Sequence, residues 1–364
     1  MSSGDRDLGL KLRMRRILWA QGFYCPVEVD LSHYEYEQRQ LMRQSLTDID
    51  VLGLRFDPDL RAQAVLVDCK SGRESDPARI FWLRGVMDFF HAEQGFFVKR
   101  KVHGHARALA PRLGIRVLDE DGLGHLERIL RADAAFTAFV DETRYARMEG
   151  LWGIDVPEGS KPTAAQVRVK NVAHYLQYLY WMVDEYRNVQ SVIEQFGLVA
   201  RDLQGAGLRE KFLAHVGLQR LSLSLLRLAG EVIGRNVRDV PAQVRGYIFG
   251  GPLLLREREA LFAAVEKIVD AKLGGEALTL EPPYYPELVE VVNKLVQYAP
   301  DASQILRIEE AVLLCRVFGH DEPIEGLLGS KPTSDAIVLA KRVALLLQKA
   351  ANLPETLFAE LHAL

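Results

Sequence analysis

The chain has 364 residues, of which 48% are hydrophobic and 26% charged, and its formal net charge is -3. This length can supply two domains with proper cores, and the composition is that of an ordinary globular protein. The charge excludes a general attraction to polyanions, so any binding of nucleic acid must come from a local basic patch. The three cysteines lie far apart, and their spacing indicates neither a zinc site nor a disulfide framework.

No apolar run reaches the roughly eighteen residues that suggest a transmembrane helix. Residues 1–16 also lack the apolar run of a secretory signal. We therefore expect a cytoplasmic protein without a membrane partner.

Residues 8–21 are expected to form an amphipathic helix that ends at Gly22. The basic residues of this helix fall largely outside its apolar stripe: Lys11, Arg13, Arg15 and Arg16. A first strand is predicted over residues 23–31. The polar and aromatic segment 33–46 is interpreted as a solvated edge strand, with the alternative that Arg43 contacts a phosphate.

Two apolar runs, residues 49–56 and 64–68, flank a turn at residues 57–59, and this pattern predicts a β-hairpin. Alternation along a strand puts Asp48 and Asp50 on one face and places Asp68 beside Lys70. Because burying an unpaired charge is costly, charged groups that converge at strand ends indicate a functional site. The alternative is a surface Asp–Lys ion pair, which contributes little to stability and often arises by chance.

An aspartate on one strand, followed by Asp-x-Lys at the end of the next, resembles the PD-(D/E)XK nuclease superfamily, which has the restriction-endonuclease-like fold. The resemblance implies that Asp50, Asp68 and Lys70 are catalytic. It further implies that Asp50, Asp68 and the backbone carbonyl of Cys69 bind Mg²⁺ or Mn²⁺. Hard oxygen ligands suit Mg²⁺, which polarises a phosphoryl oxygen and lowers the pKa of bound water. A cationic Lys70 would stabilise the charge that develops in the transition state.

Residues 17–25, ILWAQGFYC, look like the first helix and strand of archaeal Holliday-junction resolvases, which belong to the same superfamily. Many of those proteins carry a metal-binding Glu on this helix, at the place that Lys11 holds here. A third carboxylate would then have to come from elsewhere, and the candidates are Asp5, Asp7, Glu35 and Glu37.

Asp76 and Pro77 favour the start of a helix over residues 78–93, which is apolar nearly all round and is expected to be covered on both sides. A strand at 95–102, a helix at 104–113 and a strand at 115–118 follow. Together these elements have the order α-β-β-β-α-β-α-β, which matches the superfamily core. Basic residues are densest around residues 99–112, where they are interpreted either as phosphate contacts or as a solvated face. The expected nucleic-acid contacts are Arg43, Lys99, Arg100, Lys101, His103 and Arg107.

The rest of the chain shows helical patterns only. One helical run is expected over residues 125–150, and a hinge at 152–162 carries turn residues throughout. Thr163 and Gln166 form a capping box at the start of the next helix. The sequence thus predicts an α/β nuclease-like domain over residues 1–125, a helical connector over 126–162 and an all-helical domain over 163–364. That last domain would choose the substrate, bind a protein partner or a second copy of the chain, or control activity.

The expected function is that of a Mg²⁺-dependent endonuclease that hydrolyses phosphodiester bonds, with DNA favoured over RNA. A role in bacterial defence against phage or in DNA repair follows only by analogy with nucleases of this build. The alternative is an inactive nuclease-like subunit that binds nucleic acid or protein, and Lys11 and the acidic balance favour it. A third hypothesis is an assembly adaptor whose apolar tail, residues 353–364, packs on a partner, although the favoured interpretation of this tail is that it closes its own helical bundle.

Overall fold

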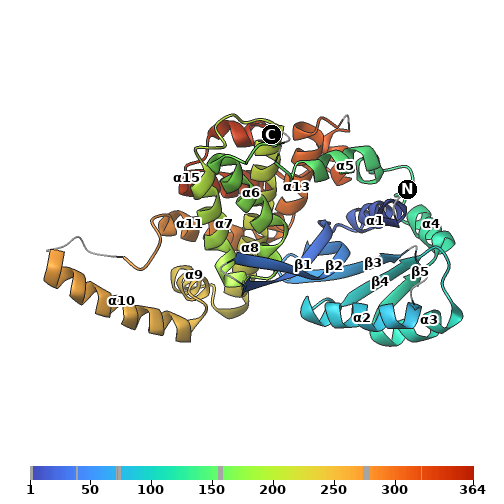
Figure 1. Cartoon of the computed structure of the whole chain (residues 1–364), viewed down its shortest axis with the longest axis horizontal. Coiled ribbons are helices and arrows are strands. Elements are labelled where there is room, and N and C mark those ends of the chain that lie inside the picture. Colours follow the sequence, from blue (N-terminus) through green and yellow to red (C-terminus); the bar gives the residue numbers. More distant parts are fainter. Residues whose placement is uncertain are drawn as a thin grey trace.

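The computed structural model describes residues 3–37, 40–70, 72, 75–154, 159–273, 279–320 and 322–364. Its N-terminal part is an open five-stranded sheet in the order β1-β2-β3-β4-β5, with helices on both faces (Figure 1). The strands are β1 (Val27–Glu37), β2 (Gln40–Phe56), β3 (Ala62–Lys70), β4 (Gln94–Lys99) and β5 (Ile115–Leu118). The helices beside them are α1 (Ser3–Ala20), α2 (Asp76–Phe89), α3 (Gly104–Leu109), the 3₁₀ turn η1 (Ala110–Leu113) and α4 (Glu120–Ile129).

The sheet is mixed, because β1, β2 and β3 run antiparallel while β3, β4 and β5 run parallel. Helix α2 makes the crossover that a parallel β3–β4 pair requires. Residues 64–69 of β3 are all buried, as expected for a strand covered on both faces. The predicted mixed sheet flanked by helices, and the hairpin within it, are confirmed.

Strand β1 begins at Val27, later than the predicted start at residue 23. Pro26 has no N–H to donate to a ladder, and Tyr24 makes only an isolated bridge with Leu54. Residues 33–37 continue β1, and residues 40–46 belong to β2, so the two form one long antiparallel hairpin at the edge of the sheet. The side chains of residues 35–42 lie outside the described part of the chain.

Helix α1 is buried on its basic side as well, which corrects the expectation of an amphipathic helix at residues 8–21. Lys11, Arg15 and Arg16 are each less than a tenth exposed. Arg15 pairs with Glu310, and Arg16 Nη2 lies 2.5 Å from Glu127 Oε1. Charges on neighbouring elements compensate these basic side chains, so the helix can be covered all round.

Helix α2 is covered on one side only, although its sequence is apolar nearly all round. Ile80, Leu83 and Met87 are buried, whereas Phe81 is 59% and Phe89 54% exposed. The prediction that both sides are covered is therefore wrong. The sheet, α3 and η1 pack against α2, yet Phe81 and Phe89 stay exposed.

The remainder of the chain is largely helical, as predicted. The expected single helix over residues 125–150 is broken, because Arg131 and Phe136 have left-handed backbone angles with φ of 53° and 56°. Helix α5 (Glu142–Gly150) starts anew with Asp141 as its N-cap. The predicted capping box of Thr163 and Gln166 opens α6. The expected boundary at residue 125 lies inside α4.

Helix α8 (Leu208–Arg235) is the centre of the helical part, and α6 (Ala164–Gln177), α7 (Glu185–Val199), α11 (Tyr285–Gln297), α13 (Ile305–Val312) and α15 (Ser334–Ala351) pack around it. The other helices are α9 (Val240–Ile248), α10 (Pro252–Leu273), α12 (Ala299–Ala302), α14 (Ile324–Leu328) and α16 (Ala359–His362). Short turns complete this part: η2 (Thr137–Val140), η3 (Leu179–Trp181), the π-helical η4 (Leu313–Val317) and η5 (Glu355–Phe358). Helix α10 projects from the body as an arm (Figure 1).

The sheet and the helical part share buried contacts through α1 and the start of β1. Trp19 Nε1 donates to the carbonyl oxygen of Leu327 at 2.5 Å, and Tyr24 Oη donates to Gln219 Oε1 at 2.9 Å. One apolar core includes residues of both parts. Within the described ranges, no helix has the length and apolar character that crossing a membrane requires.

Candidate active site

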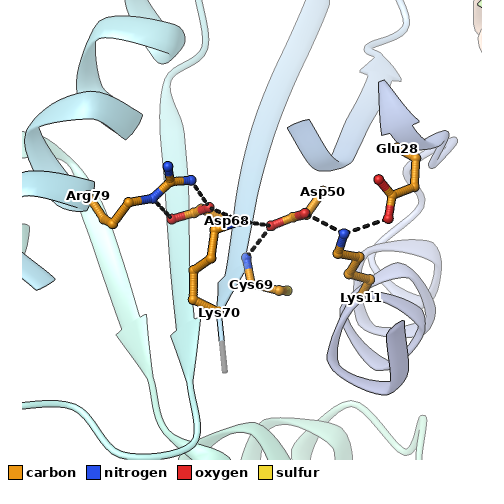
Figure 2. A network of polar contacts seen from close by, with 7 residues as sticks. All are labelled: Lys11, Glu28, Asp50, Asp68, Cys69, Lys70 and Arg79. Atoms are coloured by element: carbon orange, nitrogen blue, oxygen red, sulfur yellow. Dashed lines mark hydrogen bonds and ion pairs between the residues drawn. The ribbon is translucent and has the colours of Figure 1, made fainter. Parts of the chain in front are cut away.

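Asp50, Asp68 and Lys70 meet where β2 and β3 lie side by side (Figure 2). The antiparallel register pairs Val51 with Val67, so Asp50 and Asp68 occupy facing positions one step further along. Lys70 Nζ lies 3.8 Å from Asp50 Oδ2 and 3.6 Å from Asp68 Oδ1. Both aspartates are only 1% exposed, so their charges are compensated inside the protein rather than by water.

Asp50 is held from two further directions. The backbone N–H of Cys69 donates to Asp50 Oδ2 at 2.6 Å, which fixes the orientation of the carboxylate. Lys11 Nζ, from α1, lies 2.7 Å from Asp50 Oδ1. Burial raises the pKa of Asp50 to about 6, and the charges of Lys11 and Lys70 oppose that shift. This contact uses the N–H of Cys69, and the expected role of its carbonyl as a metal ligand stays a prediction.

Glu28, at the start of β1, is the second partner of Lys11. Lys11 Nζ lies 2.5 Å from Glu28 Oε1, so one ammonium group joins Glu28 to Asp50 (Figure 2). Burial alone would lower the pKa of Lys11, but the charges of Asp50 and Glu28 outweigh it and the pKa is raised. The sequence reasoning missed Glu28. Strand alternation gave no signal for it, because Glu28 has a left-handed backbone angle with φ of 57°.

Asp68 is held by Arg79 from the first turn of α2. Arg79 Nε donates to Asp68 Oδ2 at 3.1 Å, and Arg79 Nη2 donates to Asp68 Oδ1 in the same two-pronged contact. The guanidinium also lies over the ring of Trp82, 3.8 Å from its centroid. A bidentate, stacked arginine is a rigid partner, so Asp68 has little rotational freedom.

More carboxylates gather near Asp50 than the sequence pattern indicated. Oxygen atoms of Glu28, Asp48 and Asp50 all lie within 4.8 Å of one another. Asp7 lies one helical turn before Lys11, and its Oδ1 is buried with no hydrogen-bond partner among the described residues. Burial is the main cause that raises the pKa of the Cys69 thiol, and the charge of Asp7 raises this pKa further. The side chains of the other candidates, Asp5, Glu35 and Glu37, lie outside the described part.

The chemistry of this cluster fits a divalent cation. Its donors are hard carboxylate oxygens, the type that Mg²⁺ and Mn²⁺ prefer. Among the described side chains of this cluster, four carboxylates, Glu28, Asp48, Asp50 and Asp68, stand against three cations, Lys11, Lys70 and Arg79. The surplus of negative charge would be relieved by a bound ion. Lys11 already places one positive charge between Glu28 and Asp50.

The predicted nucleic-acid contacts do not form one patch. Lys99 is buried, with its Nζ 2.7 Å from Asp76 Oδ1, and the backbone N–H of His103 donates to the same carboxylate. Arg107 pairs with Asp119. Arg100 and Lys101 are exposed beyond the end of β4.

Arg43 lies elsewhere, on the long hairpin five positions along β2 from Asp48. Its guanidinium stacks over Tyr178 of the helical part, 3.9 Å from the ring centroid, and lies 3.6 Å from Asp30 Oδ2. These contacts attach the hairpin to the helical part, so Arg43 is not adjacent to the residues at the end of β4.

No family model matches the chain, and neither a curated protein nor a solved structure matches it. The geometry and chemistry of the site are therefore what bear on its function.

Proposed function

We propose that the chain is a divalent-metal-dependent nuclease that hydrolyses phosphodiester bonds of DNA. The observation that supports this function is the position of Lys70, whose ammonium group lies within 4 Å of both Asp50 and Asp68 at facing positions of neighbouring strands. Two buried carboxylates and one amine at a single point are what a metal-assisted attack on a phosphodiester needs.

Each residue has a distinct role in this proposal. Asp50, Asp68 and the Cys69 carbonyl would hold Mg²⁺, with Glu28 and Asp48 in reach, and the ion would supply Lewis acidity and a more acidic bound water. Lys70 binds a non-bridging phosphate oxygen and stabilises the negative charge that grows there. The N–H of Cys69 keeps Asp50 oriented.

Arg79 and Lys11 have supporting roles. Arg79 fixes the rotamer of Asp68 through its two-pronged contact, so that carboxylate does not have to be ordered when the substrate binds. Lys11 holds Glu28 and Asp50 together in the protein without substrate. To free these oxygens for an ion, the Lys11 ammonium has to swing away.

The test is cleavage of supercoiled plasmid, single-stranded DNA and RNA by the full chain with Mg²⁺ or Mn²⁺. Asp68→Asn and Lys70→Met should each lower the rate by about 100-fold or more, since each removes a charge at the reacting centre. Lys331→Met, on an exposed loop, is the matched control and should cleave like the parent. Cleavage that persists undiminished in folded Asp68→Asn would overturn the assignment.

A second function is favoured by one observation, the ammonium of Lys11 between Glu28 and Asp50. A permanent lysine there would replace the ion, and the chain would be an inactive nuclease-like subunit that binds nucleic acid or protein. Calorimetric titration with Mn²⁺ separates the two functions. Uptake by Lys11→Met but not by the parent chain would favour the binding subunit, whereas uptake by both would favour the nuclease.

A further inference from the structure

Two exposed phenylalanines lie on the outer face of α2, the helix that Figure 1 shows with α3 in the layer below the sheet. Phe81 is 59% and Phe89 54% exposed. Gly85 lies midway between them and is exposed as well, and residues four positions apart share one face of a helix. A single exposed apolar side chain is common, whereas two large rings aligned on one helix face indicate a contact surface.

The middle of this face allows another helix to come close. A Cβ atom added at Gly85 would meet nothing within 4 Å. The distance between packed helices depends on the side chains at their contact, so a glycine there permits a short one. Phe89 is already held against Phe90, with 5.2 Å between the ring centroids. A second helix would therefore pack between Phe81 and an ordered Phe89 ring.

The spacing of this face is the same in both directions along the helix, because Gly85 is four positions from each phenylalanine. An interface that two identical copies form about a two-fold axis has to be self-complementary. In an antiparallel pair of α2 helices centred on Gly85, Phe81 of one copy lies at the level of Phe89 of the other. The two glycines then meet at the axis, with a pair of rings on either side of it.

The charges beside the apolar face favour the antiparallel orientation. Arg84 pairs with Asp88, one turn later on the same flank of α2. In the antiparallel pair, Asp88 of the second copy lies on this flank too, so each Arg84 stands between two carboxylates. A parallel pair would instead turn Asp88 of the second copy toward Phe89. Opposite charges therefore meet across the axis only when the helices run antiparallel.

We propose that the outer face of α2 is the interface of a homodimer, in which two copies pair antiparallel through Phe81, Gly85 and Phe89. A helix of 14 residues is about 21 Å long, so the contact is at the small end of specific interfaces. We therefore expect a reversible dimer with a dissociation constant on the order of 10 µM. The interface does not depend on whether the chain binds a metal or cleaves DNA.

The experiment is analytical ultracentrifugation of the full chain from about 1 to 200 µM, a range that spans the expected dissociation constant. The parent should change from monomer to dimer. A double variant, Phe81→Ser with Phe89→Ser, should dimerise at least about tenfold more weakly. Leu261→Ser, at an exposed apolar position of α10, is the control and should dimerise as the parent does. Near-ultraviolet circular dichroism shows whether each variant is folded.

Two outcomes of this experiment overturn the proposal. One is a parent chain that stays monomeric at the highest concentration. The other is undiminished dimerisation of the folded double variant, which would place the interface on another surface.

A cysteine at the axis locates the interface directly. Gly85→Cys should form a disulfide-linked dimer under mild oxidation, because the axis brings the two thiols together, and the three native cysteines are buried. Gly197→Cys in α7 is the matched control, since Gly197 is also an exposed helical glycine with nothing within 4 Å of an added Cβ. It should stay largely monomeric on a non-reducing gel. Equal cross-linking of the two variants overturns the assignment.

A charge exchange tests the orientation. Asp88→Arg puts a like charge beside Arg84 of the other copy and should weaken the dimer several-fold, while adding Arg84→Glu should restore it. Dimerisation of Asp88→Arg at the parental level overturns the antiparallel arrangement.

Discussion

The ammonium group of Lys11 lies 2.7 Å from the carboxylate of Asp50, and this contact places a lysine charge beside the proposed catalytic aspartate. Asp50 is 1% exposed, so it cannot rely on water for compensation. Lys11 comes from α1, and Asp50 comes from β2. The contact therefore connects α1 to the sheet beside the carboxylates that would bind an ion.

Replacing Lys11 by Met should make the chain less stable without metal and more responsive to metal. Removing Lys11 from this buried ion pair leaves Asp50 with Lys70 at 3.8 Å as its remaining cation, and we expect a loss of about 3 kcal/mol in the free energy of unfolding in EDTA. A bound ion stabilises only the folded state, so Mn²⁺ should raise the melting temperature of Lys11→Met more than that of the parent. Differential scanning calorimetry with and without Mn²⁺ measures both effects.

Lys331→Met is the control for this comparison, because Lys331 is exposed. Its melting temperature should match the parent in EDTA and in Mn²⁺. An equal response to Mn²⁺ in the parent and in Lys11→Met would mean that Lys11 does not compete with the ion.

Arg79 and Arg84 lie on the same helix and provide a matched pair of substitutions. Arg79→Gln removes the two-pronged partner of buried Asp68 and should lower the free energy of unfolding by about 3 kcal/mol. Arg84 pairs with Asp88 at the surface of α2, so Arg84→Gln should cost less than about 0.5 kcal/mol. Urea unfolding of both variants provides the comparison. Equal losses would contradict the view that Arg79 holds Asp68 by a buried contact.

The hairpin and its charged positions could be predicted because they depend on local alternation. Side-chain parity placed Asp68 beside Lys70, and the resemblance to a nuclease family assigned Asp50 to the same site. The contacts of Lys11 could not be predicted this way, since Glu28 is 17 and Asp50 39 positions away and no periodicity within one helix reports a partner on another element.

The break between α4 and α5 is a second feature that periodicity could not predict. Apolar spacing continues across residues 125–150, and that spacing predicts one helix. The structure instead reverses the backbone at Arg131 and Phe136, which adopt left-handed angles without being glycines. Neither residue prefers these angles on its own, so local preference does not predict the break.

The basic residues around the end of β4 should separate into a structural and a binding group. Lys99→Met should lower the free energy of unfolding by about 3 kcal/mol, because it leaves Asp76 buried without its ammonium partner. A double substitution, Arg100→Ala with Lys101→Ala, should leave stability nearly unchanged. It should weaken DNA binding and reduce the dependence of log affinity on log salt by about 2.

Fluorescence anisotropy with a labelled duplex at several salt concentrations measures the binding change, and urea unfolding measures the stability change. Unaltered DNA affinity in the double variant would show that these exposed charges are only a solvated face, which is the other interpretation of the basic cluster.

Because of Glu309, the free energy of unfolding of the helical part should fall as pH rises. Its side chain is completely buried in α13 and has Ser222 as a hydrogen-bond donor, with Ser222 Oγ 2.6 Å from Glu309 Oε1. Burial raises the pKa of Glu309 from its usual 4.5 to about 8, with the Ser222 bond opposing. Between these values the folded chain keeps a proton that the unfolded chain has released. The free energy of unfolding therefore falls as pH rises through this range.

Glu309→Gln removes this titration and should be more stable than the parent near pH 9, by about 3 kcal/mol, while matching it near pH 5. Unfolding in urea from about pH 6.5 to 9 gives the cleanest comparison. In that range buried His215, whose pKa burial lowers to about 4, stays neutral in the folded chain. Glu310→Gln is the neighbouring control, and it should be destabilised at every pH because Arg15 loses its partner. A parent chain whose stability is flat across this range would contradict the proton on Glu309.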